Sequence, residues 1–324
     1  MLKPQYKKIS NFEFSSGELM PEMVIEYATQ GSKKLDKKGN ITNAILFLHG
    51  WSGDYTSIVR LNDVIGPGKV VDTDKYFVIS TTALGSPGSS SPSTTKLGVK
   101  FPQYSVKDMV NVQYRLLNKY LNVKKLKGVI GTSMGGFLTL NWATDYPNFM
   151  DFIIPIVTSF DTKGRNFAIY SFMNLLIQRD PDYQNGKYDF NPKNAVENAS
   201  MLLYLFAFSP EYYKNEFETN EILYSNLVER GVEGQEKDAN DILWRNNALK
   251  SFNIKEYLHK INAKTLIIGV NQDPLFPPET DTIPLHQMIK HSKLFLYDST
   301  QGHLGINELI KAENVIKDFL REIS

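Results

Sequence analysis

Seven short apolar runs alternate with segments of helical pattern along this 324-residue chain, and this alternation constrains the fold more than any other feature. It is typical of a mostly parallel β-sheet covered by helices. Helical spacing of apolar residues predicts core helices near Val106–Asn122 and Asn307–Ile323. We expect strands at Met23–Thr29, Ala44–His49, Tyr76–Thr82, Lys127–Gly131, Phe152–Thr158, Lys264–Val270 and Lys293–Asp298.

The alternation stops between Ser159 and about Leu249, where no convincing strand is found. A helical segment between two strands of a parallel sheet predicts a cap over the carboxyl edge, where such sheets bind ligands. We therefore expect a core of residues 1–158 and 250–324 and a helical lid insertion of residues 159–249. Its helices are predicted near Asn166–Gln178, Asn194–Phe208 and Glu211–Glu229. Its aromatic residues either line a pocket or pack within the lid: Phe167, Tyr170, Phe172, Tyr204, Phe206 and Phe208.

Composition excludes several classes of function. The chain has no cysteine, so disulfides, a cysteine nucleophile and thiolate metal sites are ruled out. The net charge of +1 gives no indication of a nucleic-acid partner. No apolar run approaches the roughly 20 residues that span a bilayer, and no apolar segment of a signal peptide follows the N-terminus. We expect a cytoplasmic protein with no membrane span, no metal and no resident cofactor.

The segment Gly131-Thr132-Ser133-Met134-Gly135-Gly136 joins a predicted strand to a predicted helix. A serine between glycines at such a turn is typical of a G-x-S-x-G nucleophile elbow. The glycines remove Cβ atoms that would clash in so tight a bend, and the serine backbone is held in a strained conformation. The pattern therefore predicts Ser133 as a nucleophile.

A serine nucleophile needs a histidine base and a carboxylate that orients the base. Among five histidines, His303 alone lies in a loop directly after the last predicted strand. His259, His286 and His291 lie in predicted helices among polar neighbours, which favours solvated surface positions. Asp273 follows a strand and lies between Ser133 and His303, which is the order of the α/β-hydrolase fold. The predicted triad is therefore Ser133, Asp273 and His303.

The oxyanion formed on the substrate needs two N–H donors. One is the amide after the nucleophile, Met134, and the other comes from the loop after an early strand. That loop contains Gly50 and Trp51, and we favour the Trp51 amide. His49 is then interpreted as a structural residue that holds this loop.

Several motifs resemble those of the homoserine O-acetyltransferase family, a branch of the α/β-hydrolases. The resemblance runs from about Asn43 to His303 and covers these blocks: Gly66–Ile79, Ala83–Ser86 with Gly88–Ser93, Phe101-Pro102, Asp108–Val110, Gly131–Gly136 and Leu275–Pro278. It implies an α/β-hydrolase fold with a mostly parallel central sheet, and an acyl group carried on Ser133. It also implies a lid and a tunnel above Ser133, and a homodimer formed through the lid.

The chain departs from this family where the acyl acceptor binds. Family members carry an aspartate after the catalytic histidine that helps to hold the amino group of homoserine, and Leu304 occupies that position here. The lid arginine that meets the acceptor carboxylate aligns with Asn174, or with Arg165 in a second alignment. We therefore assign Gly50, Arg165, Asn174 and Leu304 to the substrate pocket.

Three functions remain open at this stage. Apolar Leu304 favours a serine hydrolase, an esterase or acyl hydrolase that acts on a small or moderately apolar ester with water as acceptor. The alternative is an O-acyltransferase that moves an acyl group from the co-substrate acyl-CoA to homoserine or another hydroxyl. The third is a ligand receptor without catalysis, which an intact triad disfavours.

Overall fold

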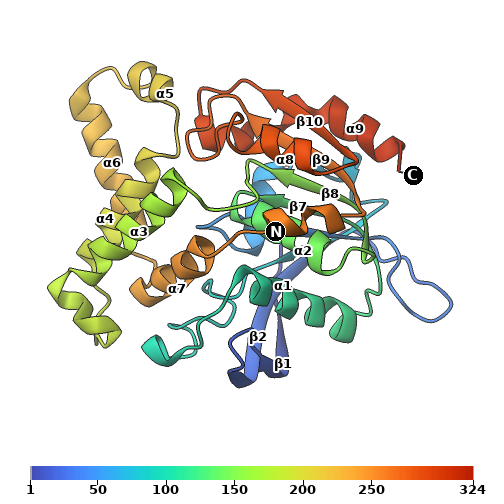
Figure 1. Ribbon diagram of the computed structural model, residues 1–324, viewed down its shortest axis with the longest axis horizontal. Coiled ribbons are helices and arrows are strands. Elements are labelled where there is room, and N and C mark those ends of the chain that lie inside the picture. The colour runs from blue at the N-terminus through green and yellow to red at the C-terminus, as the bar shows by residue number, and fades with distance from the viewer. Residues whose placement is uncertain (1, 324) are drawn as a thin grey trace.

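The computed structural model describes residues 2–323 and shows an eight-stranded sheet in the order β1-β2-β6-β3-β7-β8-β9-β10 (Figure 1). A separate two-stranded pair contains β4 and β5. From β6 to β10 every pairing is parallel, whereas β2 pairs antiparallel with both β1 and β6. The strands are β1 (Gln5–Glu13), β2 (Leu19–Gln30), β3 (Ala44–Leu48), β4 (Ile65–Gly66), β5 (Val71–Asp72), β6 (Phe77–Thr81), β7 (Leu126–Thr132), β8 (Met150–Ile156), β9 (Lys264–Val270) and β10 (Ser292–Tyr297).

All seven predicted strands are confirmed within a few residues. Strand β1 was not predicted, because lysines and polar residues dilute its apolar pattern. Only Ile9 and Phe12 of this strand are fully buried, as expected for an antiparallel edge strand with one face in the core. Strands β4 and β5 were also missed, since two residues carry no period that a sequence can show.

Two helical layers cover the sheet because neighbouring strand residues point to opposite faces. Ile45 and Phe47 of β3 pack in one apolar cluster with the C-terminal helix, whereas Leu46 and Leu48 pack in the other cluster. The core helices and turns are η1 (Tyr55–Leu61), η2 (Gly98–Lys100), α1 (Val106–Arg115), η3 (Leu116–Tyr120), α2 (Met134–Asp145), η5 (Lys255–Lys260), α8 (Thr282–Met288), η6 (Gly302–Ala312) and α9 (Glu313–Arg321).

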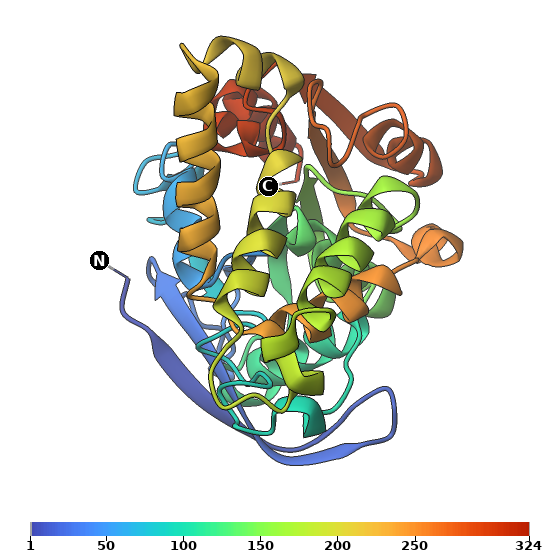
Figure 2. The ribbon, with the colours of Figure 1, turned by 90° about the vertical axis from the view of Figure 1, so that its left-hand side faces the viewer.

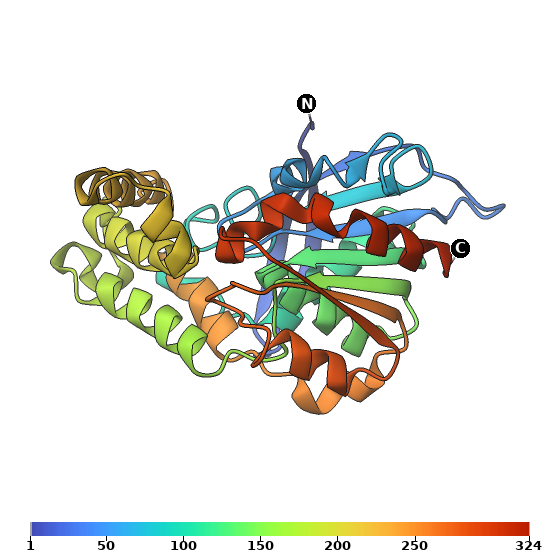
Figure 3. The ribbon, with the colours of Figure 1, turned by 90° about the horizontal axis from the view of Figure 1, so that it is seen from above.

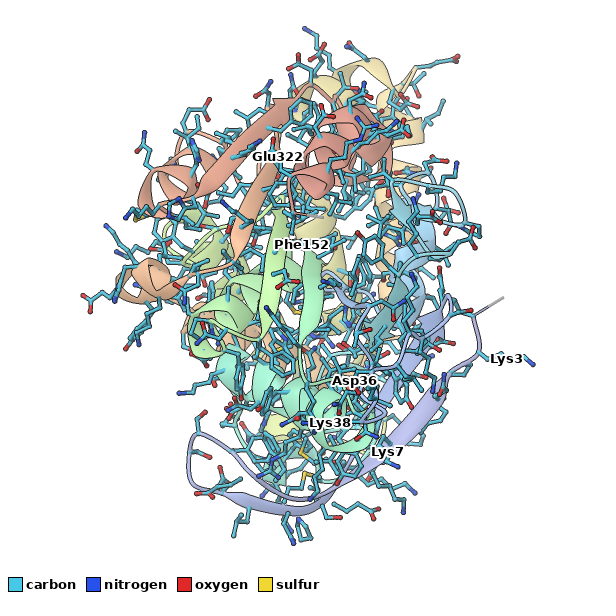
Figure 4. The ribbon with its side chains drawn as sticks, turned by 90° about the vertical axis from the view of Figure 1, so that its right-hand side faces the viewer. Lys3, Lys7, Asp36, Lys38, Phe152 and Glu322 are labelled. Atoms are coloured by element: carbon cyan, nitrogen blue, oxygen red, sulfur yellow. The ribbon has the colours of Figure 1, made fainter. Side chains whose placement is uncertain are left out.

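Both predicted core helices exist, but each is divided. The first continues from α1 into the single π-helical turn η3. The second begins as the 3₁₀ segment η6, which has a kink at Glu308, and continues as α9. Phe152 of β8 lies centrally on the side away from the helical insert in Figure 4, and its ring meets that of Phe319 in α9 edge-on. These contacts attach the C-terminal helix to the sheet.

The helical insert, defined here as residues 157–250, leaves the sheet after β8, and the chain rejoins the sheet at β9. Figures 1 and 3 show its helices α3 to α6 projecting to one side of the sheet. Helices α4 and α6 pack against one another, as Figure 2 shows in the view onto this side. Its elements are α3 (Arg165–Gln178), η4 (Pro181–Gly186), α4 (Lys193–Leu205), α5 (Pro210–Asn215), α6 (Asn220–Gly234) and α7 (Ala239–Lys250).

The first two predicted insert helices are confirmed as α3 and α4. The prediction of one helix at 211–229 is wrong, because Ser209 caps α5 and Thr219 caps a new helix, α6. Helix α7 was not predicted. It is buried on most sides, so its sequence lacks the one-sided apolar pattern of a surface helix.

Candidate active site

Ser133 lies at the turn between β7 and α2, at the carboxyl edge of the sheet. Its backbone has φ 55° and ψ −117°, a conformation that non-glycine residues rarely adopt. The Ser133 N–H donates to the Ile156 carbonyl, and the Ser133 carbonyl accepts from the Thr158 hydroxyl. The neighbouring strand therefore holds the strained residue in place.

Two glycines of the motif permit close backbone approach. A Cβ atom on Gly135 would lie 2.1 Å from the Leu48 carbonyl oxygen at the end of β3. A Cβ atom on Gly131 would lie 2.1 Å from the Gly135 carbonyl oxygen. Contacts this short are prohibitive, so the small residues are required for α2 to begin directly beside the strand ends.

His303 contacts Ser133 from the segment after β10. Its Nε2 lies 2.9 Å from the Ser133 Oγ, and its ring is almost completely buried. The insert holds this segment, since the His303 N–H donates to the Ala207 carbonyl at 2.9 Å and the Ser209 hydroxyl donates to the Thr300 carbonyl at 2.6 Å. The predicted base is therefore fixed by contacts with both the core and the insert.

Asp273 lies in the segment after β9 and is 2% exposed. Its Oδ2 is 2.8 Å from His303 Nδ1, and its Oδ1 accepts from the amides of Leu275 and Phe276. Because an ionised carboxylate only accepts hydrogen bonds, His303 carries its proton on Nδ1 and presents Nε2 as an acceptor to Ser133. The three predicted residues form one hydrogen-bonded chain.

The amides of Trp51 and Met134 have no protein acceptor among residues 2–323. Gly50 lies against Ser133, because a Cβ atom on this glycine would be 3.5 Å from the Ser133 Cβ. Two unpaired N–H groups beside a serine match the arrangement that stabilises an oxyanion. Their roles as donors stay a prediction.

His49 holds the loop that carries Trp51. Its Nδ1 lies 2.7 Å from the Gly50 carbonyl, and its Nε2 accepts from the Ala83 amide at 2.9 Å. Burial lowers the pKa of His49 to about 4, so the ring is neutral near pH 7. A neutral ring with both nitrogens engaged fits the structural interpretation.

Helix α7 supports the same loop from the other side. Arg245 is 3% exposed and donates to the Trp51 carbonyl and to the Gly85 carbonyl, each at 2.8 Å. Its guanidinium also lies 5.1 Å from the centre of the Trp51 ring, and the indole N–H donates to Asn246. No sequence motif indicated this role, because the helix that carries both residues has no recognisable period.

A cavity of about 630 Å³ opens from Ser133 and His303 toward the insert. Its walls combine core loops with residues of α4, α5 and α6. Of the six aromatic residues proposed for a pocket, Tyr170, Tyr204 and Phe208 line it, whereas Phe167 and Phe172 are half exposed on the surface. Phe206 packs against an apolar cluster instead of lining the cavity, and the exposed Phe167 and Phe172 fit neither alternative.

Four residues were predicted to line the substrate pocket, and two of them do. Gly50 and Leu304 both line the cavity. Arg165 is exposed and donates to the Pro274 carbonyl at 2.9 Å, outside the cavity lining. Asn174 is buried outside it, between Asn246 and Asn247. The structure thus places neither Arg165 nor Asn174 in the lining of the cavity that contains Ser133.

Charged residues also line this cavity, and the sequence did not single them out. They are Arg60, Glu216, Arg230, Glu233 and Lys237. Arg230 and Glu233 form an ion pair at 3.0 Å on one face of α6. Within the described residues 2–323, no three His, Asp or Glu side chains are grouped so that they could hold a metal ion. None of the helices described is long and apolar enough to cross a membrane.

Comparisons with known proteins agree with this geometry. Residues 43–306 match the family described as alpha/beta hydrolase fold. A "Probable acyltransferase" of Methanothermobacter thermautotrophicus is 46% identical over 97% of both chains. A "Homoserine O-acetyltransferase" of Deferribacter desulfuricans is 30% identical, covering 100% of this chain and 96% of its own.

Among solved structures, esterase E22 superposes with a TM-score of 0.89 at 25% identity, covering 99% of this chain and 100% of its own. The resemblance predicted from the motif blocks is therefore confirmed. The predicted α/β-hydrolase fold is confirmed as well. This chain belongs to the α/β-hydrolase family of enzymes, within the group that contains the homoserine O-acetyltransferases.

Proposed function

We propose that this protein is a serine hydrolase that cleaves a small or moderately apolar ester through an acyl-Ser133 intermediate. The observation that carries the proposal is the hydrogen-bonded chain from Ser133 through His303 to Asp273 at the base of the cavity. Family membership favours an enzyme over a ligand receptor. The predicted catalytic roles are compatible with every contact described above.

In the first step the Ser133 Oγ attacks the ester carbonyl while its proton passes to His303 Nε2. The Asp273 carboxylate stabilises the imidazolium that forms. The carbonyl oxygen becomes an oxyanion, and its proposed donors are the amides of Trp51 and Met134, which have no protein acceptor among residues 2–323. The tetrahedral intermediate collapses, the ester C–O bond breaks, and the alcohol leaves with the proton from His303.

In the second step water attacks the acyl-Ser133 carbonyl and gives its proton to His303. Collapse of this second intermediate releases the carboxylic acid and returns the proton to Ser133 Oγ. The net change is ester plus water to acid plus alcohol. We further propose that the helical insert acts as a lid over this reaction, since α4 to α6 supply one wall of the cavity.

Water is proposed as the acceptor because Leu304 lines the cavity directly after His303. An apolar side chain there provides no partner for a buried ammonium group, and an unpaired buried charge is costly. The resemblance places an acceptor-binding aspartate at this position in the acetyltransferases. Its replacement favours a neutral species such as water.

The proposal is tested with short p-nitrophenyl esters and a fluorophosphonate probe. We expect the purified protein to hydrolyse the esters and to be labelled at Ser133, and the Ser133→Ala variant to lose both activities. Loss of the nucleophile lowers kcat by roughly 10⁴-fold or more in comparable triads. Absence of both hydrolysis and labelling in a folded wild-type protein would contradict the proposal.

The second candidate is an O-acyltransferase that uses acyl-CoA and a hydroxyl acceptor such as homoserine. The name of the 46% identical relative, "Probable acyltransferase", favours it. The two candidates share acyl-Ser133 and differ in what removes the acyl group. Release of free CoA from acetyl-CoA that depends on homoserine would select the transferase, and a rate indifferent to homoserine would select the hydrolase.

Homodimer formation through the insert is proposed as well. The support is a set of large apolar side chains exposed on α3 and the following segment: Phe167, Phe172, Leu175 and Phe190. Light scattering after size-exclusion chromatography should give a mass near twice that of one 36.9 kDa chain. A monomer at micromolar concentration would contradict this. The cytoplasmic location stays a prediction.

A further inference from the structure

Lys237 is a half-buried lysine in the wall of the cavity that also contains Ser133 and His303. It lies in the short link between α6 and α7. Its backbone is fixed, because its N–H donates to the Gly234 carbonyl and its carbonyl accepts from the Asn191 side chain. Its position in the cavity wall is therefore set by the fold.

Its ammonium group has no hydrogen bond or ion pair with any residue in the part of the chain that the structure describes. Glu233 on the preceding helical turn is engaged with Arg230. Glu216 lies before the start of α6, and the 15 residues of that helix separate it from Lys237 by roughly 20 Å. The cavity thus contains a cation that nearby protein carboxylates leave unpaired.

Burial lowers the pKa of Lys237, and the positive charge of Arg245 lowers it further. Glu233 and Glu236 oppose the shift. The dominance of burial means that this ammonium group has lost part of its hydration. A ligand that covers it with apolar groups removes still more water without a compensating partner, which is unfavourable.

A buried hydroxyl group packs on Gly234, in the turn that precedes Lys237. The Ser200 Oγ on α4 is buried, has no partner among residues 2–323, and its residue lines the same cavity. A Cβ atom on Gly234 would lie 2.1 Å from this oxygen, so Ser200 packs directly on the turn whose carbonyl accepts from the Lys237 N–H. The insert wall therefore contains one ammonium group and, beside the preceding turn, one buried hydroxyl group without a partner among residues 2–323.

We propose that Lys237, with the Ser200 hydroxyl, binds a carboxylate on the ester substrate, and that the enzyme selects esters that carry this charge. The inference rests on the proposed acyl-Ser133 chemistry and adds the substrate class. One ammonium and one hydroxyl match the two oxygens of a carboxylate, whereas a phosphate dianion is commonly held by several cations or by a bidentate arginine.

The carboxylate can lie on the acyl side or on the alcohol side of the ester, and the experiment has an arm for each. On the acyl side, the p-nitrophenyl half-ester of succinate is compared with p-nitrophenyl pentanoate, which has equal length. The p-nitrophenyl half-ester of glutarate is compared with p-nitrophenyl hexanoate in the same way. On the alcohol side, O-acetyl-4-hydroxybutanoate is compared with pentyl acetate, and O-acetyl-5-hydroxypentanoate is compared with hexyl acetate. In one arm the charged ester should have a kcat/KM at least about tenfold higher than its neutral counterpart.

Lys237→Met keeps the length of the side chain and removes its charge. We expect this variant to lower the ratio of kcat/KM for charged esters to kcat/KM for neutral esters by about tenfold or more. Lys237→Arg should retain much of the preference. The matched control is Lys193→Met on α4, an exposed lysine outside the cavity, which should behave like the wild type.

An unchanged charged-to-neutral ratio in Lys237→Met would overturn the inference. So would loss of the preference in Arg60→Gln but not in Lys237→Met, since Arg60 is the exposed cation on the core side of the cavity. A wild-type enzyme that prefers neutral esters in both arms would also overturn it.

Calorimetric binding of glutarate and 5-hydroxypentanoate separates this inference from the proposed hydrolysis. If wild-type protein binds either carboxylate and Lys237→Met weakens binding about tenfold, the carboxylate site stands even where no ester is hydrolysed. If esters are hydrolysed at Ser133 but neither the ester preference nor binding depends on Lys237, the hydrolase stands and the carboxylate site fails.

Discussion

Helices α6 and α7 follow one another in the insert, but they relate to the core in opposite ways. Of the 15 residues of α6, only Gly231 and Gly234 are buried, whereas ten of the twelve residues of α7 are buried. Helix α6 packs on α4 and forms a wall of the cavity. Helix α7 binds the core loops through Asp241, Trp244 and Arg245.

This difference separates two tasks within one insert. Helix α7 holds the loop that carries the predicted oxyanion donor Trp51, so its side chains affect the reacting centre without touching the substrate. Helix α6 presents side chains to the cavity and is held mainly by close contact at its two buried glycines. Changes in α7 should therefore affect stability and kcat, and changes in α6 should affect which substrate is accepted.

The largest expected effect is on stability. Ile242→Ala in α7 removes a fully buried side chain and should lower the free energy of unfolding by about 2–5 kcal/mol. Ile222→Ala in α6 changes a side chain that is 48% exposed and should cost no more than about 0.5 kcal/mol. Urea denaturation of both variants measures the two losses in free energy of unfolding. Equal losses would contradict the proposed difference between α6 and α7.

Next in size is the effect of α7 on the reaction rate. Arg245→Met leaves the Trp51 carbonyl without its donor and frees the loop, so we expect kcat to fall by roughly 30- to 100-fold with KM nearly unchanged. Arg245→Lys should restore part of kcat. Arg230→Met on α6 is the matched control, because Arg230 contacts Glu233 and the ring of Tyr204, both in the insert, and its effect should fall mainly on KM.

The smallest expected effect is a pH dependence of stability. Burial raises the pKa of Asp241 to about 6 from an ordinary value of 3.8, while hydrogen bonds from Ser93 oppose the shift. Between these pH values the folded protein keeps a proton that the unfolded chain has lost. The stability contribution is therefore fully present below about pH 4 and is lost as pH rises through about 6.

The Asp241→Asn variant should show a flatter dependence of unfolding free energy on pH between about 4 and 6 than the wild type. Taking the difference between the two proteins removes the contributions of other acids, including Asp281, whose pKa burial also raises to about 6. The control is Glu233→Gln on α6, an exposed carboxylate that should leave the profile unchanged. If the free energy of unfolding depends on pH in the same way in wild type and Asp241→Asn, the Asp241 carboxylate does not cause the pH dependence.

The contrast between α6 and α7 also explains which residues of the candidate site could be predicted from the sequence. Strand ends, glycine spacing and chain order predicted Ser133, Asp273 and His303 together, because each depends on local pattern and on the order of the parallel sheet. The positions of Arg245 and Lys237 depend on contacts between segments far apart in the chain. Neither lies in a motif, and no periodicity indicates which wall of a cavity a residue will face.

Aromatic residues illustrate the same limit. Tyr170 and Phe172 are two positions apart on α3, yet one lines the cavity and the other is exposed on the surface. Residues two positions apart on a helix point in directions that differ by about 200°. Which of them is buried therefore depends on how the helix is rotated against α4 and α7. That rotation is a tertiary property, and composition alone could only leave both alternatives open.

The contact between the insert and the His303 segment has a consequence for any redesign of this enzyme. Because the Ala207 carbonyl and the Ser209 hydroxyl hold the backbone around His303, the insert and the core together position the predicted general base. A chimera that exchanges the insert for that of a relative should preserve the 207–209 link, or the base will lose its alignment even where the new cavity fits the substrate. To change substrate specificity, substitutions in α6 are therefore safer than exchange of the whole insert.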